Sequence, residues 1–241
     1  MPSTTEPELR YQVALAGRIL GFLGQTDAIL GFVGARAADN ASFWMKQMPM
    51  GLDEVYPGDL LRIDYDGNVI EGEGRKHNEW VLFAAMFRDH PEMVAAVHTH
   101  APYCLAVAAQ GKSIEPFDQF GTYFYANGVP LYEDTPDRVY TFELAEAILK
   151  KMGKCPASII TYHGILTHGV NVREACMRAV YLEKAAQTQL LAYQGGNAQP
   201  LNDELAIKLG LNAPYDLLYE FTWDYYERQI RAQVPDFKFN D

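Results

Sequence analysis

Apolar residues recur at helical spacing in several stretches of the chain. Residues 6–23 carry one apolar stripe and are followed by Gly24, which predicts a helix that ends there. Asn78, Thr141 and Asn171 are N-cap residue types, and each precedes a segment of helical periodicity. The pattern predicts further helices over residues 79–88, 101–109, 142–152, 171–194 and 214–233.

Shorter apolar segments between these helices have the length of strands. They cover residues 60–65, 68–70, 93–97, 128–132 and 157–162. Asp66-Gly67 separates the first two and predicts a hairpin with a type I′ turn. Strands that alternate with helices predict an α/β protein whose helices pack over a central sheet. No repeat or linker divides the sequence, so we expect one domain over 1–241 with a helical tail from about residue 200.

Two of the predicted strands lead directly into histidines. His98 and His100 are two residues apart, so on a strand both imidazoles project from the same face. His163 directly follows the strand predicted over 157–162. It precedes Gly164, where a glycine permits a close approach of the backbone or a sharp turn. Three neutral imidazoles suit Zn²⁺, Mn²⁺ or Fe²⁺. The alternatives are a polar strand end for the first pair, and His168, placed in the loop beyond Gly164, as the third ligand.

Glu79 lies at the start of the predicted helix that precedes the His98 strand. A carboxylate beside a metal ion can serve as a ligand or as a proton-transfer group. The alternative is a first-turn glutamate that interacts favourably with the helix dipole.

Composition and charge narrow the classes of partner. The 241 residues are 49% hydrophobic and carry a formal net charge of −11, which disfavours nucleic acid and anionic membranes as partners. No apolar run reaches the roughly 20 residues that cross a bilayer, and the polar segment 1–10 does not resemble a signal peptide. Three cysteines without C-x-x-C spacing predict reduced thiols and a cytoplasmic location.

The motifs around these histidines resemble the class II aldolase/adducin family over roughly residues 10–195. The similarity rests on Asn78-Glu-Trp, on Pro91-Glu-Met-Val-Ala-Ala-Val-His-Thr-His-Ala101, on Tyr162-His-Gly-Ile-Leu-Thr-His-Gly169, and on the helix segment 181–191. The resemblance implies a three-layer α/β/α domain with a largely antiparallel central sheet. It also implies that His98, His100 and His163 are the metal ligands and that Glu79 is the catalytic acid/base. Members of the family commonly form tetramers with active sites between subunits.

The departures from the family pattern concern the substrate. Phosphosugar members carry G-N-x-S and Ser-Ser motifs that hold phosphate, whereas this chain has Gly31-Phe-Val-Gly-Ala-Arg36 and His77-Asn78 there. A phosphorylated substrate is therefore disfavoured. A second branch, with G-H-x-S-x-R at the first motif, includes decarboxylases of aromatic or heterocyclic carboxylates.

Residues that replace or retain parts of these motifs are candidates for substrate binding. Arg36 matches the arginine of the decarboxylase branch, and a guanidinium can bind a substrate carboxylate bidentately; the alternative is a surface arginine after a strand. The aldolases' proton-donating tyrosine aligns with Gln119, which has Tyr123 nearby. Gln119 and Tyr123 are therefore further candidates.

These observations predict a metal-dependent carbon–carbon lyase of the aldolase or decarboxylase type. We expect one divalent ion per chain, Zn²⁺ before Mn²⁺ or Fe²⁺, and a small, non-phosphorylated hydroxy-carbonyl or carboxylate substrate. A homotetramer is expected, with neither nucleic acid nor membrane as a partner. Two alternatives stay open, which are a non-haem iron oxygenase on the same fold and a non-catalytic adducin-like interaction domain.

Overall fold

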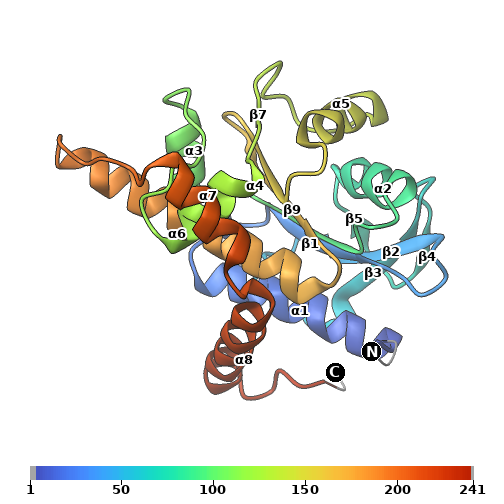
Figure 1. Cartoon of the computed structure of the whole chain (residues 1–241). Helices are drawn as coiled ribbons and strands as arrows, with labels where there is room; N and C mark the ends of the chain where they lie inside the picture. The colour runs from blue at the N-terminus through green and yellow to red at the C-terminus, as the bar shows by residue number, and fades with distance from the viewer. Residues whose placement is uncertain (1–3, 240–241) are drawn as a thin grey trace.

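The computed structural model describes residues 4–239 and has a central sheet with helices on both faces (Figure 1). In this part of the chain the sheet has nine strands in the order β4-β3-β2-β1-β6-β9-β8-β7, with β5 paired to β2. The strands are β1 Phe32–Arg36, β2 Ser42–Met48, β3 Leu60–Asp64, β4 Val69–Glu71, β5 Arg75–Lys76, β6 Ala95–Thr99, β7 Leu131–Tyr132, β8 Ala157–Ile160 and β9 Gly164–Gly169. All pairs are antiparallel except β7 with β8.

Two layers of helices cover the two faces of this sheet. The helices are α1 Glu6–Phe22, α2 Trp80–Asp89, α3 Pro102–Ala108, α4 Gln119–Asn127, α5 Phe142–Met152, α6 Val172–Gln194, α7 Asp203–Asn212 and α8 Tyr215–Gln233. One core joins the sheet to α1, α3, α4, α6 and α8, and a second joins it to α2 and α5. The expected three-layer α/β/α arrangement with a largely antiparallel sheet is confirmed.

Strand β6 lies in the middle of the sheet and contributes to both cores. Ala95 and Val97 belong to the core under α1 and α6, while Ala96 belongs to the core under α2 and α5. Because side chains alternate along a strand, His98 follows Ala96 onto the α2 side. Its ring contacts Phe32, which belongs to the α2 and α5 core.

Some elements differ from the sequence prediction. Helices α4 and α7 and strands β1, β2, β5 and β9 were not predicted as separate elements, and the strand expected over 128–132 is only Leu131–Tyr132. His168 therefore lies in β9 rather than in a loop, and its Nε2 lies 3.1 Å from the Cys155 carbonyl oxygen. The reason is tertiary, because β9 is defined by its pairing with β6 and β8 on either side.

The hairpin at residues 60–71 forms with a different turn from the one expected. Gly67 has a positive φ of 87°, but Asp66 does not, so the turn is not type I′. The Asp64 side chain instead accepts the backbone N–H groups of Asp66 and Asn68.

The expected C-terminal helix over 214–233 is confirmed as α8, which packs on α1 and α6. The first three residues of the polar segment 1–10 lie outside the described residues. None of the helices described is long and apolar enough to cross a membrane.

Candidate metal centre and its pocket

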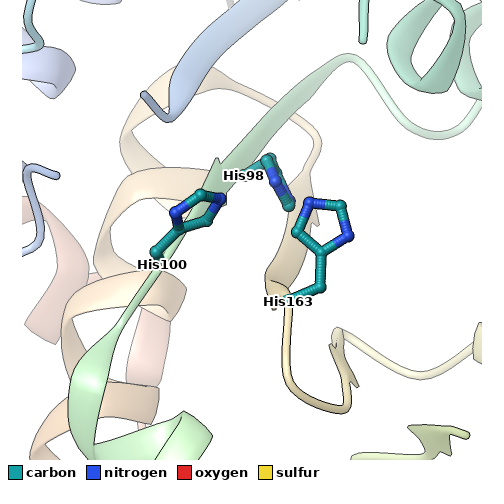
Figure 2. A group of neighbouring side chains, drawn as sticks. All are labelled: His98, His100 and His163. Carbon is teal, nitrogen blue, oxygen red and sulfur yellow. The ribbon is translucent and has the colours of Figure 1, made fainter. Parts of the chain in front are cut away.

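Three imidazole rings from two neighbouring strand ends converge on one point (Figure 2). One ring nitrogen from each of His98, His100 and His163 lies within 4.8 Å of the other two. The ring centroids of His98 and His163 are 5.0 Å apart, and the ring centroid of His100 lies 5.6 Å from each of them. The structure therefore brings together the three histidines that the sequence singled out.

The positions of these histidines follow from the pairing of β6 with β9. His98 lies opposite Leu166, and His163 lies in the short turn between β8 and β9, where its N–H donates to the Ile160 carbonyl. Gly164 starts β9 directly beneath the imidazoles. A Cβ added there would lie 2.9 Å from His98 Cε1 and 2.7 Å from the Thr99 carbonyl oxygen. The glycine after His163 is thus required by the close approach of β6.

Hydrogen bonds donated by Nδ1 leave the Nε2 atoms of two of these rings available. His98 Nδ1 lies 2.9 Å from the Ile165 carbonyl oxygen, so Nδ1 carries the proton because a carbonyl only accepts. His100 Nδ1 lies 2.9 Å from Asp27 Oδ2 in the same manner. The buried Nε2 atoms of both rings have no hydrogen-bond partner among the described residues. Metal-binding histidines usually donate a hydrogen bond from the ring nitrogen that does not bind the metal, so this donor set fits a divalent ion.

Glu79 is a second carboxylate in contact with the cluster, in addition to Asp27. It occupies the N-cap position of α2 but makes no side-chain capping bond, and only 5% of its surface is exposed. Its Oε1 accepts the backbone N–H of Val139 at 2.7 Å and lies 3.2 Å from His163 Nε2. The second contact is poorly aligned for a hydrogen bond. The side chain therefore points at the histidines rather than serving its own helix.

Burial and charge set the protonation of this cluster. Burial lowers the pKa of His98 to about 3, so this ring is neutral at pH 7, as a metal ligand must be. Burial alone would raise the pKa of Glu79, but its contact with His163, the nearby His98 and the Val139 N–H outweigh it and lower the pKa to about 2. Glu79 is therefore ionised at neutral pH.

A pocket of about 550 Å³ opens beside the cluster. Its lining includes Glu79, His100 and His163, and it extends to residues of the segment between β7 and α5. The lining residues are Asp27, Leu30, Met48, His77, Asn78, Glu79, His100, Pro102, Leu105, Pro136, Arg138, Tyr140, Tyr162 and His163. A small molecule can thus reach the histidine cluster and Glu79 together.

Arg36 lies away from this pocket. It ends β1, whose Phe32 pairs with His98, so Arg36 is about 13 Å further along the strand. Its guanidinium donates to the Tyr65 hydroxyl and to the His90 carbonyl of its own chain. The structure therefore does not bring Arg36 to the histidines.

Gln119 and Tyr123 lie on α4 and are also outside this pocket. Gln119 lines a different cavity, of about 870 Å³, between α4, α7 and α8. The Tyr123 hydroxyl accepts a hydrogen bond from Arg178 Nε at 3.1 Å, and its ring packs against Tyr215. Within one chain, neither side chain faces the histidine cluster.

Three residues that lie beside the cluster were not identified from the sequence. Asp27 holds His100, Val139 holds Glu79, and Arg138 brings a cation to the pocket. All three lie in segments without regular periodicity, between predicted elements. The acidic residue type at position 27 was the only available signal, because their proximity to the histidines arises from the folded chain.

Comparisons with known proteins show which family and which fold this chain is similar to. The sequence model of the Class II Aldolase and Adducin N-terminal domain matches residues 11–190. A 3,4-dihydroxyphthalate decarboxylase from Arthrobacter keyseri is 31% identical over 205 residues, which is 80% of this chain and 82% of that protein. A 4-hydroxy-3-prenylphenylpyruvate oxygenase/4-hydroxy-3-prenylbenzoate synthase from Streptomyces roseochromogenus is 25% identical, over 95% of this chain and 83% of that protein. The crystal structure of an aldolase II superfamily protein from Pseudomonas syringae superimposes with a TM-score of 0.87 at 24% identity, covering 98% of this chain and 96% of that chain.

Proposed function

This chain belongs to the class II aldolase and adducin family, and we propose on that basis that it is a metal-dependent carbon–carbon lyase. The reaction is an aldol cleavage or a decarboxylation of a small, non-phosphorylated hydroxy-carbonyl or carboxylate compound. The single observation that carries the proposal is the cluster of His98, His100 and His163, with Glu79 beside it, on the wall of a pocket.

Each residue of the cluster has a separate role in this proposal. His98, His100 and His163 hold one divalent ion, with Zn²⁺ as the expected metal. When bound, such an ion polarises a carbonyl oxygen and accepts developing negative charge. Glu79 is ionised at neutral pH and is therefore in the form that can accept a proton. In this proposal it takes a proton from the substrate and returns it to the carbon that loses its partner.

Two observations support a substrate without phosphate. Phe32 and Gly34 stand where phosphosugar members of the family carry polar donors. Phe32 is fully buried against Phe83, and a side chain at Gly34 would collide with Phe83, so this segment offers a ligand no side-chain donor. The decarboxylase from Arthrobacter keyseri is named for a substrate that carries carboxylates rather than phosphate.

Two further features are part of the same proposal. The protein is a homotetramer, and Gln119 and Tyr123 touch substrate only if they reach the pocket of a neighbouring copy. The three cysteines of the chain are unpaired, which supports a cytoplasmic location.

The oxygenase similarity supports a second candidate function. Because a relative named as an oxygenase aligns over 95% of this chain, the same three histidines could hold iron for an oxidation. Metal analysis and a test for oxygen consumption separate this candidate from the lyase.

The decisive experiment compares metal content and reaction in the parent and in the double variant His98→Ala, His100→Ala. We expect about one divalent ion per parent chain, none in the variant, and a far-ultraviolet spectrum that is unchanged by the substitutions. A screen of hydroxy-carboxylates and sugar phosphates should then show metal-dependent release of an aldehyde or of carbon dioxide from the former. Full metal occupancy in the double variant, or efficient cleavage of fuculose 1-phosphate, would contradict the proposal.

A further inference from the structure

The segment between β7 and α5 is tied directly to Glu79. The backbone N–H of Val139 donates to Glu79 Oε1 at 2.7 Å, and the Val139 side chain is fully buried in the core under α2 and α5. This anchor fixes the backbone on both sides of it. Arg138, the preceding residue, is thereby held beside the proposed catalytic carboxylate, and it lines the same pocket.

Arg138 is the only Lys or Arg among the described residues that line this pocket. The two carboxylates there are already engaged, Asp27 by His100 and Glu79 by Val139 and His163. With a divalent ion bound to the three histidines, that ion and Arg138 would together supply three positive charges against these two negative ones. The metal-loaded pocket would then have an excess of positive charge that suits an anionic substrate.

The guanidinium of Arg138 is exposed and has donors to spare. Within the described residues its one side-chain hydrogen bond runs from Nη1 to the Tyr140 hydroxyl oxygen at 3.2 Å. A guanidinium carries five N–H donors, so a fork remains for a ligand. Because the Tyr140 oxygen accepts this bond, its own O–H is free to donate to the same ligand. Arg138 and Tyr140 thus present adjacent donors at the pocket.

We propose that Arg138, supported by Tyr140, binds the carboxylate of the substrate while the substrate's oxygen pair faces the histidine cluster. This inference rests on the proposed function and names the residue that selects the substrate class. A carboxylate matches one planar guanidinium fork bidentately. Arg36, which the sequence suggested for this role, is bonded to its own chain at the far end of β1.

Two probes separate the carboxylate from the rest of the ligand. Catechol and 3,4-dihydroxybenzoate share a vicinal oxygen pair and differ by one carboxylate. We expect zinc-loaded protein to bind 3,4-dihydroxybenzoate about 10- to 100-fold more tightly than catechol in calorimetry, the usual range for a charge-assisted hydrogen bond. Added salt should reduce this preference and leave catechol binding nearly unchanged.

Substitutions assign the preference to Arg138. Arg138→Gln should abolish it without changing catechol affinity, zinc content or thermal stability, and Arg138→Lys should restore part of it. Tyr140→Phe should weaken only the binding of 3,4-dihydroxybenzoate. Arg231→Gln is the matched control, because it removes one exposed arginine on α8 that lies outside the pocket lining. This control should bind both probes as the parent does.

The possible failures are distinguishable. Equal affinity for the two probes in the parent, or a preference that survives Arg138→Gln, would overturn the assignment of Arg138 and leave the lyase proposal standing. If zinc-loaded parent protein binds neither probe, the placement of an oxygen pair at the histidine cluster is contradicted, and the role of Arg138 is rejected with it.

Discussion

Glu79 is the N-cap residue of α2, where a carboxylate can interact favourably with the helix dipole, but its side chain is directed elsewhere. Its side chain makes no capping bond to α2 and instead contacts His163 and the Val139 N–H. A helix-dipole role would be worth only roughly 0.3–1 kcal/mol, and its loss would leave turnover nearly unchanged. A proton-transfer role makes a much larger difference, which a single substitution can measure.

We expect Glu79→Gln to fold, to keep most of its metal through the three histidines, and to lose at least about a hundredfold in turnover. The glutamine keeps the shape of the side chain and an oxygen for the Val139 N–H, but it cannot take up a proton. Turnover at saturating metal is to be measured together with metal content and thermal stability. If the variant remains nearly as active as the parent, proton transfer belongs to another group.

His168 provides a test of the electrostatics at a site away from the histidine cluster. The pKa of His168 is lowered to about 4 from its ordinary value of 6.5. Burial is the larger cause, and the positive charge of the nearby Arg178 is the second. Between about pH 6.5 and pH 4, His168 is therefore protonated in the unfolded chain but neutral in the folded chain. The stability that depends on neutral His168 is present above about pH 6.5 and is lost as the pH falls towards 4.

The variant His168→Gln keeps an N–H for the Cys155 carbonyl and removes the titration. Between pH 7 and pH 4 we expect the free energy of unfolding of the parent to fall by roughly 1–3 kcal/mol more than that of the variant. Urea unfolding of both proteins across this range measures the difference. Parallel stability curves would mean that His168 titrates normally in the folded state.

At the scale of elements, the packing of α2 on β1 determines what the segment after Gly31 can do. Gly34 lies between β2 and β6 in the sheet, and a Cβ there would meet Phe83 Cδ2 at 2.7 Å and the Trp44 carbonyl oxygen at 2.8 Å. The absence of a side chain at Gly34 is therefore explained by packing. The same packing buries Phe32 and closes this segment to ligands.

Gly34→Ala should destabilise the fold by about 1–3 kcal/mol, because the added methyl group overpacks the contact between α2 and the sheet. The control is Gly58→Ala in the 3₁₀ turn Pro57–Asp59, where a Cβ would meet nothing within 4 Å. Thermal unfolding of both variants beside the parent measures the difference. Equal midpoints for the two variants would show that the helix moves aside at no cost.

At the scale of the whole molecule, α7 and α8 carry a group of exposed apolar side chains. Leu209, Leu211, Leu217 and Phe221 are 47%, 60%, 51% and 59% exposed. All of them except Leu211 line the cavity of about 870 Å³ to which Gln119 also contributes. Exposed apolar patches of this kind are typical of interaction sites. This surface is consistent with the homotetramer that the family resemblance implies.

Light scattering should give a particle of about four times the 27.1 kDa chain mass. The double variant Leu217→Glu, Phe221→Glu should give a smaller particle with an unchanged far-ultraviolet spectrum, because it places charges on the apolar surface. Ile70→Glu, an exposed apolar position on β4, is the matched control and should leave the mass unchanged. A monomeric parent would contradict both the tetramer and the proposal that Gln119 and Tyr123 reach a neighbouring pocket.

Local patterns in the sequence determined most of the helices and the motifs that bring His98, His100 and His163 together. Helical periodicity and N-cap residues such as Thr141 and Asn171 are encoded within a few neighbouring positions, so they can be recognised without the fold. The spacing of His98 and His100 likewise follows from the period of a strand. For Gly164 the sequence predicted either a close approach or a sharp turn, and only the fold shows that the atoms it accommodates belong to another strand.

The surroundings of the site were decided only by the tertiary structure. Strand β9 forms because β6 and β8 pair with it. Asp27 and Arg138 reach the pocket, and Val139 reaches Glu79, from segments without periodicity. Arg36 matched a motif by its position in the sequence, yet the antiparallel pairing of β1 with β6 carries it to the far end of the strand from His98. Sequence spacing fixes which residues share a face of one element, whereas the distance between residues on different elements depends on register and packing across the whole chain.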